Sequence, residues 1–286
     1  MDHPQAEIKI DTENRTCEMH GDYEAKRLFA SRFTACPKCV EQERAAREAR
    51  EAAERKSRQE ANRAARVEVL LRESGLIGRQ LECTFDSYRV TNGAKQQAVL
   101  DDCRAYIELF QRGQDLPTTT LWLIGPAGTG KSHLGAAMVN HLIRTHATSA
   151  RVHTVKELIR MLRAMWNRDR AAPATRWVEN DDGSGHLEQI GAATEDELIR
   201  DLGECTLLVL DDVGAGHGSE AELVQLLEIV DLRYRLQRPT VVLSNLTATE
   251  LKGTVGDRLY DRLREGATIK ACNWGSMRGE FARRAA

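Results

Sequence analysis

A glycine-rich stretch near the middle of the chain has the residue types that bind phosphate. Gly125 is followed by four residues and then by Gly130, Lys131 and Ser132, which fits G-x-x-x-x-G-K-[ST]. In this pattern backbone N–H groups surround the phosphates, the lysine contacts the β- and γ-phosphates, and the hydroxyl binds Mg²⁺. We therefore expect a site for ATP and Mg²⁺ formed by Gly125, Pro126, Ala127, Gly128, Thr129, Gly130, Lys131, Ser132 and His133.

Two further motifs place polar groups at the ends of apolar runs. "TLLVLDD" ends with Asp211 and Asp212, and "PTVVLSN" ends with Asn245. After a phosphate-binding motif the first is typical of a Walker B strand, in which Asp211 lies beside Mg²⁺ and Asp212 polarises the attacking water. Asn245 would sense the γ-phosphate or orient water. The alternatives are a buried strand ending in solvated acids, and a helix cap or turn at Asn245.

A second group of candidate ligands lies near the N-terminus. Cys17 and His20 form a C-x-x-H pair, and Cys36 and Cys39 form a C-x-x-C pair. Together they supply the four N/S ligands of tetrahedral Zn²⁺, with no position left open for catalysis. We expect a structural zinc, because the segment has few large apolar residues around which to fold. The alternative is a set of unrelated reduced thiols and a surface histidine.

Basic and aromatic residues are mixed in the stretch "KELIRMLRAMWNR". Arg160, Arg163 and Arg168 could follow phosphates while Trp166 stacks on a base, a combination that sequence-tolerant binding of single-stranded DNA uses. In the alternative, Trp166 packs with Met161 and Leu162 into the core. Both interpretations remain open on the sequence.

Alternating strands and helices must position these residues. Strand-like segments at 121–124, 151–155, 206–214 and 239–245 are each followed by a helical pattern. This alternation indicates an α/β fold with a parallel sheet buried on both faces and flanked by helices. The polar tract 167–195 interrupts the rhythm with Pro, Gly and acidic residues, and we expect it to be a mobile insertion.

The chain of 286 residues exceeds a typical single domain, which suggests one sizeable core with an appendage. We expect a zinc-binding module at 1–42, a charged helical arm at 43–75 and an ATPase domain at 76–286. The arm is rich in Ala, Glu and Arg with opposite charges three or four residues apart, which favours a long helix. It is either a solvated spacer or an arm that grips a partner protein.

Composition excludes several classes of protein. The formal net charge is −2, so a nucleic-acid surface must be local. No run of ~20 apolar residues exists to span a bilayer, and the polar start lacks the pattern of a signal peptide. We expect a cytoplasmic protein with no membrane partner. Seven cysteines, an odd number with three near the N-terminus, argue against a disulfide framework.

Five stretches in a fixed order carry a resemblance: "GPAGTGKSHLGAA", "LLVLDDVG", "PTVVLSN", "GDRLYDRLREG" and "NWGSMRGE". They resemble the AAA+ ATPases of the DnaC-type replicative helicase loaders and their IstB-like relatives. The resemblance begins near Ser74 and runs to the C-terminus. Many AAA+ proteins share the single motifs, but the combination with the short "NWGSMR" ending is much narrower. It implies an AAA+ fold, ATPase activity and a bacterial or phage-infected bacterial cell.

Carried over residue by residue, the family pattern makes Lys131 and Ser132 the Walker A pair, Asp211 and Asp212 the Walker B pair, and Asn245 sensor 1. Arg262 matches the arginine finger, Arg258 the arginine one turn before it, and Arg278 the sensor-2-like arginine. A finger acts on the nucleotide of a neighbouring subunit, so the resemblance implies self-association as an ATP-dependent oligomer or a helicase-templated spiral. From the residues alone, Arg258 and Arg262 can also be interpreted as a pair of exposed helix arginines with no catalytic role.

The sequence departs from the family pattern in two places. Many relatives have Asp-Glu where this chain has Asp211 and Asp212. The shorter Asp212 is set back by one methylene, which predicts a slow, switch-like ATPase without affecting ATP binding. The N-terminal zinc module departs from the DnaC pattern but resembles the zinc-bearing helicase-binding domains of other bacterial loaders.

Three functions compete on this basis. The first is an ATP-dependent loader that binds a replicative hexameric DNA helicase and ssDNA and delivers the helicase to DNA during replication initiation. The second is an IstB-like ATPase that assists a transposase on target DNA. The third, a P-loop kinase or metabolic nucleotide enzyme, lacks a recognisable motif for a small substrate. We expect the first.

Overall fold

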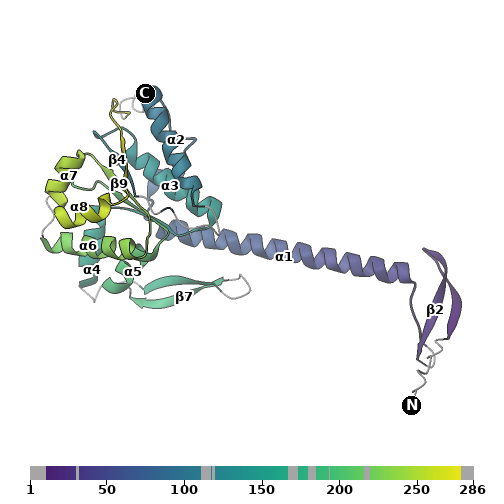
Figure 1. Ribbon diagram of the computed structural model, residues 1–286. Coiled ribbons are helices and arrows are strands. Elements are labelled where there is room, and N and C mark those ends of the chain that lie inside the picture. Colours follow the sequence, from purple (N-terminus) through teal and green to yellow (C-terminus); the bar gives the residue numbers. More distant parts are fainter. Residues whose placement is uncertain are drawn as a thin grey trace, which may run out of the picture. The chain divides into compact units, whose positions relative to one another are not determined.

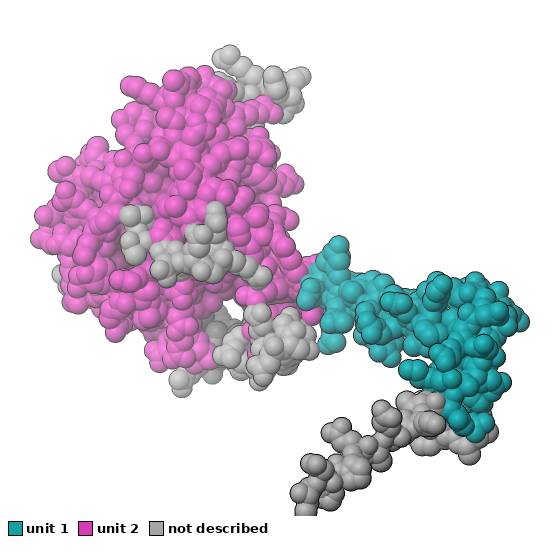
Figure 2. All heavy atoms as spheres, turned by 45° about the vertical axis from the view of Figure 1, so that its right-hand side comes forward, with its two compact units in different colours: residues 1–61 teal, residues 62–286 magenta. Residues whose placement is uncertain are grey.

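The computed structural model describes residues 11–29, 32–110, 117, 120–166, 173–179, 185–192, 194–215 and 220–277. The chain divides into two compact units, Met1–Ala61 and Asn62–Ala286, which Figure 2 colours separately. None of the helices in these ranges combines the length and hydropathy that crossing a bilayer requires. The predicted boundaries at 42/43 and 75/76 stay predictions.

The first unit has almost no apolar core. Strands β1 (Thr12–Cys17) and β2 (Gly21–Phe29) form an antiparallel hairpin, and the short β3 (Arg32–Phe33) pairs with β2 (Figure 1). Helix α1 (Pro37–Glu73) follows and continues into the second unit. Among the described residues of the first unit, only Ala25 and Cys36 are buried. Burial of apolar surface therefore contributes little to its fold.

Helix α1 confirms the predicted helical pattern and begins earlier than 43. Ion pairs at i,i+4 spacing lie along its exposed part, including Arg44–Glu48, Arg47–Glu51 and Arg50–Glu54. Such pairs stabilise a helix by only ~0.3–0.5 kcal/mol each. Along the helix, only Val69 and Leu70 are buried. The exposed part therefore depends on helix propensity and charge pairing.

The second unit is built on a five-stranded parallel sheet with the order β10-β4-β9-β8-β5. The middle strands β4, β9 and β8 carry the motifs at their carboxyl ends. The strands are β4 (Leu121–Ile124), β5 (Ala150–Thr154), β8 (Leu207–Asp211), β9 (Thr240–Ser244) and β10 (Thr268–Ala271).

Alternate strand residues enter two different cores. Leu121, Leu123 and Val209 belong to one buried cluster, whereas Trp122 and Leu208 belong to the other. This period of two places one core on each face of the sheet, as expected for a buried parallel sheet. The covering helices are η1 (Gly78–Glu82), α2 (Ala94–Glu108), α3 (Lys131–His146), α4 (Val155–Trp166), α5 (Glu195–Glu204), α6 (Glu220–Arg235), α7 (Ala248–Val255) and α8 (Asp257–Arg264).

The predicted insertion 167–195 contains a β-hairpin. Strands β6 (Pro173–Glu179) and β7 (Gly185–Ala192) pair in antiparallel register. A Cβ added to Gly185 would lie 2.4 Å from the Trp177 ring, so the two strands pack closely there. Residues 167–172, 180–184 and 193 lie outside the described residues, and the predicted mobility of the tract stays a prediction.

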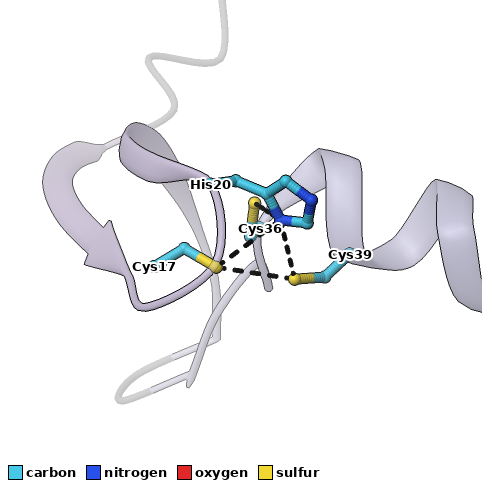
Figure 3. A group of neighbouring side chains, drawn as sticks. All are labelled: Cys17, His20, Cys36 and Cys39. Carbon is cyan, nitrogen blue, oxygen red and sulfur yellow. Dashed lines mark hydrogen bonds between the residues drawn. The ribbon is translucent and has the colours of Figure 1, made fainter.

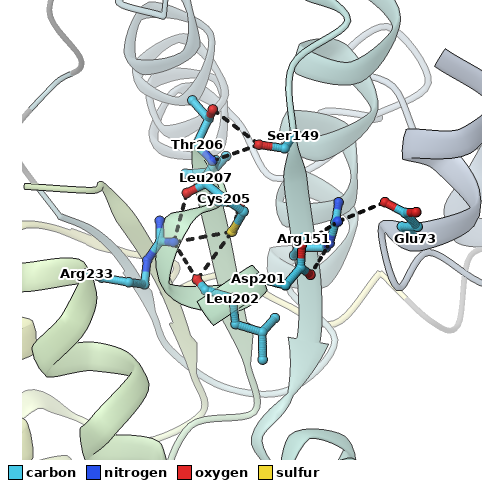
Figure 4. A network of polar contacts seen from close by, with 9 residues as sticks. All are labelled: Glu73, Ser149, Arg151, Asp201, Leu202, Cys205, Thr206, Leu207 and Arg233. Atoms are coloured by element: carbon cyan, nitrogen blue, oxygen red, sulfur yellow. Dashed lines mark hydrogen bonds and ion pairs between the residues drawn. The ribbon is translucent and has the colours of Figure 1, made fainter. Parts of the chain in front are cut away.

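The end of α1 is attached to edge strand β5. The Val152 N–H donates to the Ser74 carbonyl at 2.7 Å, and Gly75 adopts φ 80° where a Cβ would lie 2.1 Å from the Val152 oxygen. The buried Arg151 side chain donates to Glu73 and, with two bonds, to Asp201 (Figure 4). A bidentate, desolvated arginine pair is among the stronger polar contacts in proteins. It ties α1, β5 and α5 together.

Candidate functional site

The P-loop connects β4 to α3, as predicted. Gly128 and Gly130 have φ values of 86° and 90°, a region that favours glycine. The Thr129 carbonyl accepts hydrogen bonds from the Tyr88 hydroxyl at 3.2 Å and from Trp274 Nε1 at 2.9 Å, and the Gly128 carbonyl accepts from the backbone N–H of Met277 at 2.8 Å. Carbonyls bonded to flanking segments cannot point at a phosphate. These contacts shape the loop for an anion.

Lys131 begins α3 and is buried. Its Nζ donates to the carbonyls of Gly125 and Pro126 at 2.7 and 2.8 Å. A buried ammonium group requires such partners. Phosphate oxygens would take the place of these carbonyls, so the lysine side chain fits the role predicted for it.

The carboxyl ends of β8 and β9 bring the other predicted residues to the P-loop. Asp211 is buried at the end of β8, and burial raises its pKa, although hydrogen bonds from Ser132 and the Asp212 backbone N–H oppose the increase. Asp212 is exposed, and its carboxylate accepts from Asn245 Nδ2 at 3.1 Å. Asp212 has φ 53°, a left-handed conformation that Asp adopts more readily than most residues. Ser132 and Asp211 thus present the oxygen ligands that Mg²⁺ prefers.

One cavity of about 220 Å³ joins these groups. Sequence reasoning missed part of its lining, which the segment before α2 and the segment after β10 supply. The lining residues are Ser87, Tyr88, Arg89, Ala127, Gly128, Gly130, Lys131, Ser132, His133, Asp211, Asp212, Asn245 and Met277.

His133 has a second role at this site. Its Nε2 is 3.0 Å from the Thr84 carbonyl and 3.2 Å from the Ser87 hydroxyl, so it fastens the preceding segment to α3. The sensor-2-like Arg278 lies outside the described residues, directly after Met277. The short "NWGSMR" ending was the only sequence signal that this segment approaches the nucleotide site.

The arginines of α8 lie elsewhere. Arg258 and Arg262 do not line the P-loop cavity. They donate to the two carboxylate oxygens of Asp231, at 3.3 and 2.8 Å. No sequence pattern pointed to Asp231. The geometry is compatible with action on a neighbouring subunit, and the finger role stays a prediction.

Three of the four predicted ssDNA residues lie on α4, and the fourth lies outside the described residues. Arg160 and Arg163 are exposed, while Leu158 and Leu162 on the opposite side are buried. The amphipathic helix therefore presents both arginines to solvent. Trp166 ends the helix, but its side chain lies outside the described residues, so its stacking role stays a prediction.

The four predicted zinc ligands converge at the start of the chain (Figure 3). Cys17 ends β1, His20 lies in the following turn, and Cys36 and Cys39 flank the start of α1. Their ligand atoms all lie within 4.8 Å of one another. The Cys17 and Cys39 sulfurs are 3.5 Å apart, and the Cys39 sulfur is 3.3 Å from His20 Nδ1. A zinc tetrahedron with Zn–S bonds of ~2.3 Å has edges of roughly 3.8 Å, so the donor set fits the metal.

Local hydrogen bonds already favour a thiolate in this group. The Met19 backbone N–H, together with His20 and Cys39, lowers the pKa of Cys17 to about 6. Its hydrogen bond with Cys17 raises the pKa of Cys39 to about 11. A bound zinc ion would displace the proton that remains on this pair of sulfurs, since metal binding requires thiolates.

Comparison with known proteins agrees with this geometry. The chain is 30% identical over 218 residues to the replicative helicase loader DnaC of Escherichia coli (strain K12), a match that covers 76% of this chain and 78% of that protein. It is 31% identical over 254 residues to the uncharacterised protein YdaV of the same strain, covering 88% and 91%. No family model matches the chain.

Solved structures share the fold. The crystal structure of the DnaC helicase loader matches with a TM-score of 0.54 at 18% identity, covering 68% of this chain and 99% of that one. The replication initiator DnaA bound to AMPPCP and single-stranded DNA matches with a TM-score of 0.51 at 18% identity, covering 71% and 54%.

The parallel sheet, the P-loop and these neighbours define an AAA+ P-loop ATPase domain. The polar groups at the ends of β8 and β9 line the same cavity as the P-loop residues. The chain belongs to the family of DnaC replicative helicase loaders.

Proposed function

We propose that this chain is an ATP-dependent loader that binds a replicative hexameric helicase and single-stranded DNA and delivers the helicase to DNA during replication initiation. One observation carries the proposal: the P-loop cavity is assembled within a chain whose relatives are replicative helicase loaders. Those relatives do not favour the transposase alternative.

The nucleotide chemistry follows from the residues at the cavity. Lys131 contacts the β- and γ-phosphates of the substrate ATP, and the first turn of α3 contributes its N–H groups. Mg²⁺, held by Ser132 and Asp211, neutralises phosphate charge when it is bound. Asp212 orients and polarises the attacking water, and its hydrogen bond to Asn245 links water positioning to the sensor. Arg278 contacts the nucleotide from the C-terminal segment.

Hydrolysis is slow and switch-like in this proposal. Asp212 is one methylene shorter than the glutamate of many relatives, so its carboxylate is set back from the water. Completion of the site requires Arg262 of a neighbouring subunit, with Arg258 beside it, because a guanidinium stabilises charge on the departing γ-phosphate. ATP turnover is therefore coupled to assembly.

Partner binding is divided between the two units. The zinc module and the arm capture the helicase, and α4 contacts ssDNA through Arg160, Arg163 and Trp166. The exposure of both arginines supports the second assignment, as does the likeness to a DnaA structure that is bound to single-stranded DNA. Trp166→Ala should then lose ~1–3 kcal/mol of stacking per base, measured by anisotropy with labelled oligo-dT. Binding equal to wild type would place the tryptophan in the core.

A loading assay tests the whole proposal. Covalently closed circular ssDNA has no end, so the helicase ring must be opened to enter it. We expect the full chain with ATP to place the replicative helicase of its own host on the circle, scored by unwinding of an annealed strand. Lys131→Ala and Cys39→Ser should each abolish loading, and Lys95→Ala, an exposed lysine on α2, should not. Unwinding that is independent of this chain, or no complex with the helicase, would refute the proposal.

A further inference from the structure

Helices α6 and α8 bring a carboxylate, two guanidinium groups and an aromatic ring together. Arg262 Nε donates to Asp231 Oδ1 at 2.8 Å, and Arg258 Nη2 donates to Asp231 Oδ2 at 3.3 Å. The Arg262 guanidinium lies over the Tyr234 ring, 4.4 Å from its centroid. Asp231, Tyr234 and Arg262 line a cavity of about 580 Å³ that shares no lining residue with the P-loop cavity. The nucleotide of the same chain is therefore not its target.

The two arginines are held in different ways. Arg262 uses Nε and the face of its guanidinium, and within the described part of the chain no hydrogen bond is found from its Nη1 or Nη2. Arg258 instead uses a terminal Nη2 group for Asp231. Terminal Nη groups make the forked contacts with phosphate oxygens. Asp231 and Tyr234 thus hold Arg262 through its Nε and the face of its guanidinium, and its two terminal groups make no hydrogen bond to the described residues.

The backbone beneath Arg262 is also fixed. Leu259 and Leu263 of α8 are buried in the core, and Trp122 Nε1 from β4 donates to the Leu263 carbonyl at 3.0 Å. The Trp122 and Tyr260 rings meet edge to face, with centroids 5.6 Å apart. Because the backbone of α8 is fixed, a single neighbouring carboxylate can set the orientation of the Arg262 side chain.

We propose that Asp231 is the positioning residue of Arg262: its carboxylate fixes Nε and Tyr234 fixes the guanidinium plane, so that both Nη groups face the ATP of a second copy of this chain. Arg258 holds the other Asp231 oxygen and supports the carboxylate. The inference rests on the proposed function of Arg262 as the finger. It gives separate structural roles to two arginines that the residue types alone do not distinguish.

A mixing experiment with full-length chains tests the proposal. The Arg262→Ala chain keeps its nucleotide site but donates no finger, and the Asp212→Asn chain donates a finger but turns over no ATP. Each should be nearly inactive alone, and an equimolar mixture should recover ATP turnover in trans. If the mixture recovers nothing, Arg262 is not a finger, and both the proposed function of Arg262 and this inference are overturned.

Asp231→Ala is then added to one partner at a time. In the finger-donating Asp212→Asn chain it should lower the recovered kcat about tenfold or more, the cost of misaligning a catalytic group, with an unchanged KM for ATP. In the Arg262→Ala chain the same change should have no effect. Equal effects in both chains, or none in the finger-donating chain, would overturn the proposal while leaving the finger in place.

Matched variants distinguish the positioning of Arg262 from an effect of the substitutions on folding. Asp261→Ala removes an exposed carboxylate beside Arg262 and should leave recovered turnover unchanged. Asp231→Asn keeps the shape and one acceptor oxygen and should lose less than Asp231→Ala. All variants should keep the wild-type unfolding midpoint. A loss of turnover equal in Asp261→Ala and Asp231→Ala would mean that net charge, not position, controls the arginine.

Discussion

The zinc module and the P-loop site hold their functional residues by different means. In the module the four ligands lie among exposed strands, with only Ala25 and Cys36 buried among the described residues of the first unit. The P-loop site lies at the edge of a sheet with a buried cluster on each face. A zinc ion bound by these ligands would cross-link the module, whereas the nucleotide site is positioned by packing before any ligand arrives. Perturbations should therefore affect the two regions independently.

The largest expected effect is the loss of zinc. Chelation or Cys39→Ser should unfold the β1–β3 module, because structural zinc contributes on the order of 10 kcal/mol to such folds. Hydrogen exchange should show β2 amides losing protection while β4 and β8 keep theirs. Cys83→Ser, outside the cluster, should change nothing. Full protection of β2 in metal-free protein would break the contrast between the two regions.

The second-largest expected effect is a change at the nucleotide site that leaves the zinc module intact. Lys131→Ala should weaken ATP binding by about 1.5–3 kcal/mol, the range for hydrogen bonds to charged groups, which is roughly tenfold to more than a hundredfold. Titration calorimetry measures the loss, and metal content gives the control, which should stay at one zinc per chain. A parallel loss of zinc would mean that the two regions are coupled.

Sequence patterns predicted which residues converge at each site, because each set depends on short-range spacing or on strand ends. Lys131, Asp211 and Asn245 meet since parallel strands share one carboxyl edge. Pro37 at the first position of α1 was also a usable signal, and it explains why the helix begins before 43.

The contacts that brace the site could not be predicted. Trp274 reaches the Thr129 carbonyl because β10 pairs beside β4, and Tyr88 reaches the same carbonyl from the segment before α2, and no local pattern reveals either contact. Asp231 lies within an ordinary amphipathic helix and acquires its role from the packing of α6 against α8. The contacts of such residues can be identified only from the tertiary structure.

A smaller effect concerns the Walker B end. Asp212→Glu should raise kcat about tenfold, a fraction of the ~10²–10⁴-fold that general acid–base catalysis typically contributes, by bringing the carboxylate nearer to the water. The left-handed φ of 53° at this position should cost the longer residue roughly 1 kcal/mol of stability. Steady-state turnover and thermal unfolding measure the two parts. A lower kcat with normal ATP binding would show that the backbone conformation, not side-chain length, limits the reaction.

The smallest effect is on pH dependence. Burial lowers the pKa of His153. It also lowers the pKa of His141, which is less buried. As pH falls below about 6.5, the unfolded chain takes up protons that the folded chain does not, so stability decreases through this window until the folded pKa values are reached. His153→Gln should reduce this slope by at most one proton in denaturant titrations at pH 5.5 and 7.5, and His141→Gln by less. An unchanged slope would mean that His153 protonates without cost.

The junction after α1 has a consequence for aggregation. Strand β5 is one edge of the sheet, and sheet edges can recruit a strand from another molecule. Ser74 occupies the N–H of Val152, and Gly75 lies against the Val152 carbonyl, closer than any side chain would allow. We therefore expect the segment that attaches the arm also to oppose strand addition at this edge, so that the solubility of the ATPase domain would depend on the same few backbone atoms as the attachment of the arm.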